Sequence, residues 1–243
     1  MLYVTFCYEP DATMLAMVAE RLHELDPAAI IYGVNDSTAP ITGGVEGVSL
    51  IPSTFQRGRN LNGLECILHQ LHTYRELLAR HGADYIIKFD CDCWPNHLGE
   101  FTDTENRPGG YCPPDFLITE RWQAFTPAGY CYRLSRWMVE ALLREFARRT
   151  RAKLWPPQNK YPEDVTLWAL AAATRLPVRL IPFVSGFSTG AEDTLPAPGC
   201  RQLTAGLVHC GEPHADGTRC HRATATLRMQ LLHAANKQHT HHA

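Results

Sequence analysis

Two carboxylates two residues apart, Asp90 and Asp92, directly follow the apolar run of residues 85–89. Such a run is typical of a buried strand, and ligands of open α/β sheets bind outside the carboxyl ends of strands. In an extended segment residues two apart point the same way, so both carboxylates can face one crevice while Cys91 points away. Two oxygen ligands of this kind suit Mg²⁺ or Mn²⁺ and leave positions for phosphate oxygens.

Two alternatives stay open for this segment. The acids can simply begin a turn after a strand. If the chain is not extended there, the mixture of Cys91, Asp92 and Cys93 favours a softer metal such as zinc.

A second pair of acids, Glu163 and Asp164, follows Pro162 at the start of a predicted helix. Proline at the first helical position and carboxylates in the first turn also have a purely structural explanation, because they suit the positive end of the helix dipole. A functional interpretation requires one carboxylate to point into a cleft and act as a general base.

His209 lies in the segment of residues 207–211 and could bind a metal through its neutral imidazole, although a structural histidine is the commoner case. It also opens a loose cluster of cysteines and histidines within residues 209–221. The cluster lacks the paired Cys-x₂-Cys spacing, so it indicates zinc only weakly. Its members are His209, Cys210, His214, Cys220 and His221.

Three further residues could contact a nucleotide. Asp36 follows the predicted strand of residues 29–34, where a carboxylate can bind a ribose or a base, or can cap a turn. Arg57 and Arg59 lie in a loop before a predicted helix, where guanidinium groups attract phosphate. A solvated basic loop is the alternative. The sequence has no P-loop and no Gly-x-Gly-x-x-Gly, which argues against kinases, ATPases and dinucleotide-binding proteins.

The elements that must position these residues alternate along the chain. Asp11 is expected to cap the first helix, and Gly82 to end the second. Strands that are apolar on both faces, alternating with helices, predict an α/β fold with a mostly parallel central sheet flanked by helices. Apolar runs predict strands over residues 2–7, 29–34, 45–51, 85–89 and 178–183, and helical spacing predicts helices after residue 11 and over residues 60–81, 135–149, 162–174 and 224–235.

Composition limits the function classes. The 243 residues are 45% apolar and 20% charged, which is ordinary for a globular protein. The net charge of −2 argues against nucleic acid as the main partner. No apolar run reaches the ~18 residues of a membrane helix. Nine scattered cysteines and no signal peptide predict a cytoplasmic protein with reduced thiols. One domain over residues 1–237 is the simplest organisation, with a polar tail, 238–243, expected to be disordered.

Together these motifs resemble the glycosyltransferases of the GT-A fold, above all the β-1,3-galactosyltransferase and Fringe group. Residues 88–92 are similar to the group's Lys-x-Asp-Asp-Asp, residues 128–135 to its glycine-rich strand ending in Leu-Ser, and residues 163–165 to its Glu-Asp-Val. The similarity spans residues 73–167. The middle aspartate of the group's triplet is Cys91 here, and the group's N-terminal membrane anchor is missing.

The resemblance implies a role for each site residue. It implies that Asp92 binds Mn²⁺ or Mg²⁺ against the phosphates of a nucleotide sugar, and that Asp90 holds the ribose or shares the metal. It implies that His209 completes the metal shell. Asp164 is then the base of an inverting transfer, with Glu163 beside it. With the residues named above, the donor-binding candidates are Asp36, Arg57, Arg59, Lys88 and Asp90.

The expected protein is therefore a metal-dependent glycosyltransferase with a nucleotide-binding half, residues 1–92, and an acceptor half, residues 93–237. We expect it to move a sugar from a UDP-linked donor to an acceptor hydroxyl. One alternative is a nucleotidyltransferase, although residues 7–11 lack the glycine-rich basic loop of such enzymes. The other is a non-catalytic module that binds a glycan, a nucleotide or, through residues 209–221, zinc.

Overall fold

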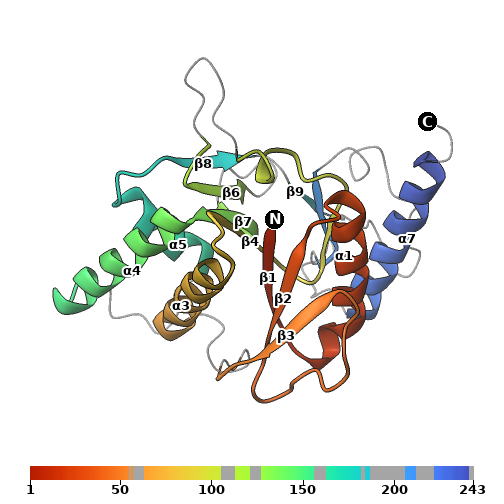
Figure 1. The fold of residues 1–243 in the computed structure, drawn as a ribbon, viewed down its shortest axis with the longest axis horizontal. Helices are drawn as coiled ribbons and strands as arrows, with labels where there is room; N and C mark the ends of the chain where they lie inside the picture. The colour runs from red at the N-terminus through yellow and green to blue at the C-terminus, as the bar shows by residue number, and fades with distance from the viewer. Residues whose placement is uncertain are drawn as a thin grey trace, which may run out of the picture.

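The chain folds around one large sheet (Figure 1), and the computed structural model describes residues 1–54, 56, 63–104, 113–120, 127–155, 163–181, 184–186, 206–211 and 222–240. The sheet has seven strands in the order β3-β2-β1-β4-β7-β6-β8. β1, β2, β3 and β4 are mutually parallel, and β7 runs antiparallel to both β4 and β6. The expected α/β fold with a mostly parallel sheet is confirmed. The strands are β1 Leu2–Cys7, β2 Ile30–Asn35, β3 Val48–Pro52, β4 Tyr85–Phe89, β6 Phe116–Glu120, β7 Pro127–Ser135 and β8 Val178–Ile181.

Helices cover both faces of this sheet and enclose two apolar cores (Figure 1). One core lies under α3, α4 and α5, and the other lies under α1 and α7. Because side chains alternate between the faces of a strand, β1 supplies Leu2 and Val4 to the first core and Tyr3 to the second. The helices are α1 Ala12–Leu25, α3 Leu64–His81, α4 Arg136–Arg151, α5 Glu163–Ala172 and α7 Arg222–Thr240.

A second, small sheet lies on the side of α1 and α7. It consists of β5 Cys93–Pro95, β10 Leu207–His209 and β9 Val184–Gly186, with β10 in the middle. β10 runs antiparallel to β5 and places His209 opposite Cys93. This pairing brings the segment after residue 206 against the turn that follows β4. The three-residue strands were not predicted from the sequence.

Two helix ends differ from the expectation. Asp11 stands at the first position before α1, but its side chain makes no capping hydrogen bond. It is buried instead and its carboxylate pairs with Arg222 at 3.2 Å. At the other end of the chain α7 extends to Thr240, and the expectation of a disordered tail over residues 238–243 stays a prediction. Gly82 ends α3 in the left-handed conformation, at φ 60°, as predicted.

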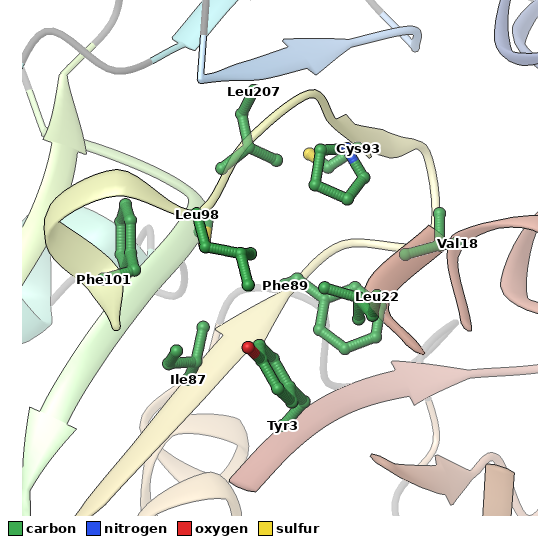
Figure 2. Close-up of a pocket in the computed structure, with 11 residues that line it drawn as sticks. Tyr3, Val18, Leu22, Ile87, Phe89, Cys93, Leu98, Phe101 and Leu207 are labelled. Atoms are coloured by element: carbon green, nitrogen blue, oxygen red, sulfur yellow. The ribbon is translucent and has the colours of Figure 1, made fainter. Parts of the chain in front are cut away.

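An apolar cavity lies between α1, β1, β4 and β10 (Figure 2). Tyr3, Ile87 and Phe89 contribute to its wall, and no charged side chain is among its described lining residues. The Tyr3 hydroxyl is hydrogen-bonded to Asp26, at 3.1 Å. This cavity is therefore a packing feature of the core rather than a place for chemistry. Among the helices in the described part of the chain, none combines the length and apolarity that crossing a membrane requires.

Candidate active site

The carboxylates after β4 lie in a tight turn. Strand pairing with β7 stops at Phe89, and the Cys93 N–H then donates to the Asp90 carbonyl at 3.0 Å. The expected extended conformation is therefore wrong, because the chain bends here to enter β5. Asp90, Cys91 and Asp92 nevertheless all line one cleft. Their proximity comes from the turn, not from the alternation of an extended strand.

The thiols beside these carboxylates are buried. Cys91 is buried, and its sulfur lies 3.3 Å from the Thr5 hydroxyl. Burial, reinforced by the charges of Asp92 and Asp90, raises the pKa of Cys93 well above its ordinary value. Zinc, the softer metal left open above, binds the thiolate and would therefore have to displace a proton from such a thiol.

The cleft joins segments that are distant in the sequence. The turn after β4 forms one wall, and the first turn of α7 forms another. Carboxylates and one guanidinium are its charged groups among the described residues. The lining residues are Phe6, Asp11, Met14, Asp90, Cys91, Asp92, Gly211, Arg222 and Ala225.

Asp92 and His209 form the closest contact between two predicted metal ligands. The Asp92 Oδ2 lies 3.4 Å from the His209 Nε2. The Cys210 N–H donates to the Asp92 carbonyl at 2.8 Å and fixes the two segments together. The ring of Tyr130 stacks on the imidazole at 3.8 Å between centroids and 18° between planes. The orientation of His209 is thus set from two sides.

This pair of donors suits a divalent cation. Two neighbouring ligands of an octahedral ion with bonds of about 2.1 Å lie roughly 3 Å apart, close to the separation of Asp92 and His209. A carboxylate suits Mn²⁺, and a neutral imidazole is the commonest side-chain ligand of metals in proteins. No group of three or more His, Cys, Asp or Glu side chains with metal-binding geometry occurs within the described residues. The contacts therefore support two protein ligands, leaving other positions for oxygens of a bound molecule.

Asp90 is paired with Lys88 rather than with His209. The Lys88 Nζ lies 2.7 Å from Asp90 Oδ1 and also donates to the Gly129 carbonyl. Burial alone would lower the pKa of Lys88, but Asp90 and Glu163 outweigh it and raise that pKa well above its ordinary value. Burial and the charge of Asp92 raise the pKa of Asp90, while Lys88 opposes the rise. Lys88 is thus a buried partner of the protein's own acceptors, not an exposed donor ligand.

The two acids of α5 have different surroundings. Glu163 accepts hydrogen bonds from the Tyr132 hydroxyl at 2.5 Å and from the Gln70 amide at 3.0 Å. Asp164 accepts from two backbone groups, the N–H of Gly129 at 3.2 Å and that of Val165 at 2.8 Å. Both Glu163 oxygens are therefore engaged by neighbouring side chains, whereas Asp164 accepts from backbone groups within the described part of the chain. Of the two, Asp164 is better suited to take a proton from a ligand.

Comparison with known proteins identifies structures with a similar fold. No protein-family model and no curated protein matches this sequence. A glycosyltransferase involved in glycosylation of the major capsid of PBCV-1 has a similar structure, with a TM-score of 0.55 and 13% identity over 95% of this chain and 98% of that one. The galactosyltransferase LgtC, solved with donor and acceptor sugar analogues, matches at a TM-score of 0.50 and 14% identity over 95% of each chain. An active-site mutant of LgtC matches at 0.51 and 13% identity, over 97% of this chain and 96% of that one.

The chain has the GT-A glycosyltransferase fold. The similarity extends over nearly the whole length of each of these structures. At this level of identity it establishes the arrangement of the elements alone. The closer resemblance to the β-1,3-galactosyltransferase and Fringe group stays a prediction.

Asp36, another predicted donor ligand, does not line the cleft. Asp36 is buried, and its Oδ1 accepts from the N–H groups of Thr38 at 2.6 Å and Ala39 at 3.1 Å. It therefore caps a turn, the alternative given above. The other candidates lie outside the described residues: Arg57, Arg59, Pro162, His214, Cys220 and His221.

Gly211, Tyr130 and Arg222 lie at the site but were not identified from the sequence. Gly211 lies against Asp92, and Tyr130 packs on His209. Arg222 pairs with the buried Asp11, and its guanidinium lies over the ring of Tyr8, 4.5 Å from the centroid. Only Gly211 carried a sequence signal, since it follows the candidate ligand His209 closely. The other contacts depend on tertiary structure.

Proposed function

We propose that the protein is a metal-dependent glycosyltransferase that moves a sugar from a UDP-linked donor to an acceptor hydroxyl. The observation that carries this proposal is the contact with His209 made by Asp92, a residue that lines the cleft at the carboxyl end of β4 in a GT-A fold. That edge of an open α/β sheet is where ligands bind. The structurally similar proteins are glycosyltransferases, and one was solved with donor and acceptor sugar analogues.

The cleft suits the leaving group of such a reaction. A sugar diphosphate gains negative charge as the glycosidic bond breaks, and a divalent cation held by Asp92 and His209 would supply Lewis-acid stabilisation of that charge. Asp90 lines the same cleft, where it would bind the ribose or share the cation. Arg222 contributes a positive charge from another wall, and its side chain is 46% exposed.

We assign the base to Asp164. The acceptor hydroxyl must lose a proton as it attacks, and a positioned carboxylate can accept it, which typically contributes about 10²–10⁴-fold. Direct displacement with one base inverts the configuration of the transferred sugar, so we propose an inverting enzyme. Because one base is sufficient and we assign it to Asp164, Glu163 must have another role.

We also propose a cytoplasmic location, on the basis of the thiols. The cysteines that the structure describes are buried thiols, as expected for a protein that matures in a reducing compartment. They are Cys7, Cys66, Cys91, Cys93, Cys131 and Cys210.

The function is tested by thermal unfolding with UDP, with Mn²⁺ and with both. Ligands that bind only the folded state raise the unfolding temperature, and we expect a clear rise only when UDP and Mn²⁺ are present together. Asp92→Asn should abolish the rise, whereas Asp84→Asn, an exposed carboxylate just before β4, should retain it. Unchanged unfolding temperatures across UDP, GDP and metal mixtures would contradict the proposal. Binding without any hydrolysis or transfer of the sugar would favour the non-catalytic module instead.

A further inference from the structure

We propose that Lys88 and Glu163 form a positioning unit that couples the donor side of the site to its catalytic base. Lys88 holds Asp90, and Glu163 holds the first turn of α5, which carries Asp164. The inference rests on the proposed function, because it assigns the two residues a part in the same reaction. It also gives Glu163 a role other than catalysis.

One ammonium group connects three elements. Lys88 stands on β4 and is 4% exposed. Its Nζ contacts Asp90 Oδ1 in the turn after β4 at 2.7 Å, and lies 3.8 Å from Glu163 Oε1 at the start of α5. It also donates to the carbonyl of Gly129 on β7. A shift of this side chain would therefore be transmitted to Asp90, to α5 and to β7.

Glu163 extends the connection to α3. Its Oε1 accepts from Tyr132 and its Oε2 accepts from Gln70, a residue of α3. The Tyr132 hydroxyl lies in turn 2.8 Å from that of Tyr74 on α3. The first residue of α5 is thus fixed to β7 and to α3. Asp164, the next residue, is fixed by the N–H of Gly129, whose carbonyl accepts from Lys88.

The electrostatics make this unit sensitive to single changes. A buried ion that loses its partner is strongly destabilising, because the remaining charge stays desolvated. Without Lys88, the carboxylates of Asp90 and Glu163 would lose the cation that contacts both of them, and they would shift from their observed positions. A neutral residue at position 88 should therefore disturb donor binding and transfer together. A neutral residue at position 163 should disturb α5, and hence transfer, more than donor binding.

Arg133 provides a matched control. It is another fully buried cation, on the adjacent strand β7, where it donates to the carbonyls of Glu100 and Phe101, each at 3.0 Å. None of the hydrogen bonds described for Arg133 reaches a candidate site residue. Arg133→Met should therefore lower stability without changing the kinetics of the folded enzyme. A purely structural Lys88 would behave in the same way.

The experiment measures three quantities for each variant: the unfolding temperature, the Kd for UDP with Mn²⁺, and kcat for sugar transfer or donor hydrolysis. Because small misplacements of reacting groups cost up to about 10²-fold, we expect Lys88→Met to lose about tenfold or more in both donor affinity and kcat. Glu163→Gln should keep donor affinity within about threefold while kcat falls by about tenfold or more. Lys88→Arg, which keeps the charge, should recover part of both losses.

Tyr132→Phe removes one hydroxyl from the unit and covers the case in which the charge variants do not fold. We expect its kcat to fall several-fold with donor affinity unchanged. A folded Lys88→Met with wild-type Kd and kcat, or wild-type kcat in Tyr132→Phe, would overturn the inference while leaving the proposed function intact. A wild-type protein with neither Mn²⁺-dependent UDP binding nor turnover would refute both.

Discussion

The carboxylate of Asp92 fills the space that a side chain at position 211 would need. A Cβ added to Gly211 would lie 2.1 Å from Asp92 Oδ2 and 3.3 Å from His209 Nε2. Contacts under 3 Å between such atoms require something to move. The absence of a side chain at residue 211 therefore allows Asp92 to approach His209, the contact on which the proposed cation site depends.

Gly211→Ala should accordingly weaken UDP binding in the presence of Mn²⁺. Overpacking costs about 1–3 kcal/mol, which corresponds to roughly 5- to 150-fold in affinity if the strain falls on the site. Isothermal titration calorimetry measures the effect. Gly43→Ala is the control, because nothing lies within 4 Å of an added Cβ at that position. Wild-type affinity in Gly211→Ala would show that UDP binding does not require the observed position of Asp92.

Tyr130 should contribute to cation affinity through its ring alone. Its side chain stacks on His209, whereas its backbone carbonyl, which accepts from the Asp90 N–H, does not depend on the side chain. Stacked aromatic pairs contribute about 0.5–1.5 kcal/mol. Tyr130→Ala should therefore weaken Mn²⁺-dependent UDP binding several-fold, and Tyr130→Phe should preserve it. Equal losses in the two variants would point to the hydroxyl instead of the stacking.

Asp164→Asn should separate donor binding from transfer. The substitution keeps the size of the side chain but removes the charge that accepts a proton, so kcat should fall by about 10²–10⁴-fold with UDP affinity unchanged. Steady-state kinetics and calorimetry on the same preparation measure both. Glu65→Gln, an exposed carboxylate in the first turn of α3, should leave both quantities unchanged. Retained transfer in Asp164→Asn would exclude Asp164 as the base.

Arg222→Met should weaken binding of inorganic pyrophosphate in the presence of Mn²⁺. A hydrogen bond to a charged group contributes about 1.5–3 kcal/mol, so we expect an affinity loss of at least tenfold that shrinks as salt is added. Arg144→Met removes an exposed guanidinium from α4 and should have no effect. Equal pyrophosphate affinity in the two variants would indicate that the phosphates bind away from Arg222.

Glu145 gives a prediction about pH and stability. Hydrogen bonds from Arg148 and Arg149 lower the pKa of Glu145 to about 2. A carboxyl group with a depressed pKa stabilises the folded state above its unfolded pKa, and this contribution is lost as pH falls toward the folded pKa. Urea unfolding should therefore show Glu145→Gln to be less stable than wild type at pH 7, with the difference shrinking from about pH 5 downward. A difference independent of pH would contradict this assignment.

The main elements of the fold were predictable because their signals are local. The spacing of apolar residues indicates which face of an element is buried, both in the run before Asp90 and in the helix that ends at Gly82. The three-residue strands of the small sheet carry no such period. Their pairing depends on contact between Cys93 and His209, which are far apart in the sequence. Propensity within either segment could not reveal that pairing.

The site was predictable only in part, for the same reason. The sequence marks Lys88 as a lone charge in an apolar strand, but its contacts with Asp90 and Glu163 appear only when β4 and α5 meet. The alternation argument for Asp90 and Asp92 was wrong because strand pairing ends at Phe89, a tertiary fact. The structure brings His209 to Asp92, where the family resemblance implied a shared metal site, whereas residue spacing alone did not indicate it.

The ion pair of Asp11 with Arg222 joins residues that are 211 positions apart. During translation the first of them leaves the ribosome long before the second is made. The cleft therefore lacks one wall for most of the synthesis of the chain, and a nascent polypeptide should not capture a phosphate-bearing ligand there. Ligand capture in this cleft would begin only once α7 has been made and has docked.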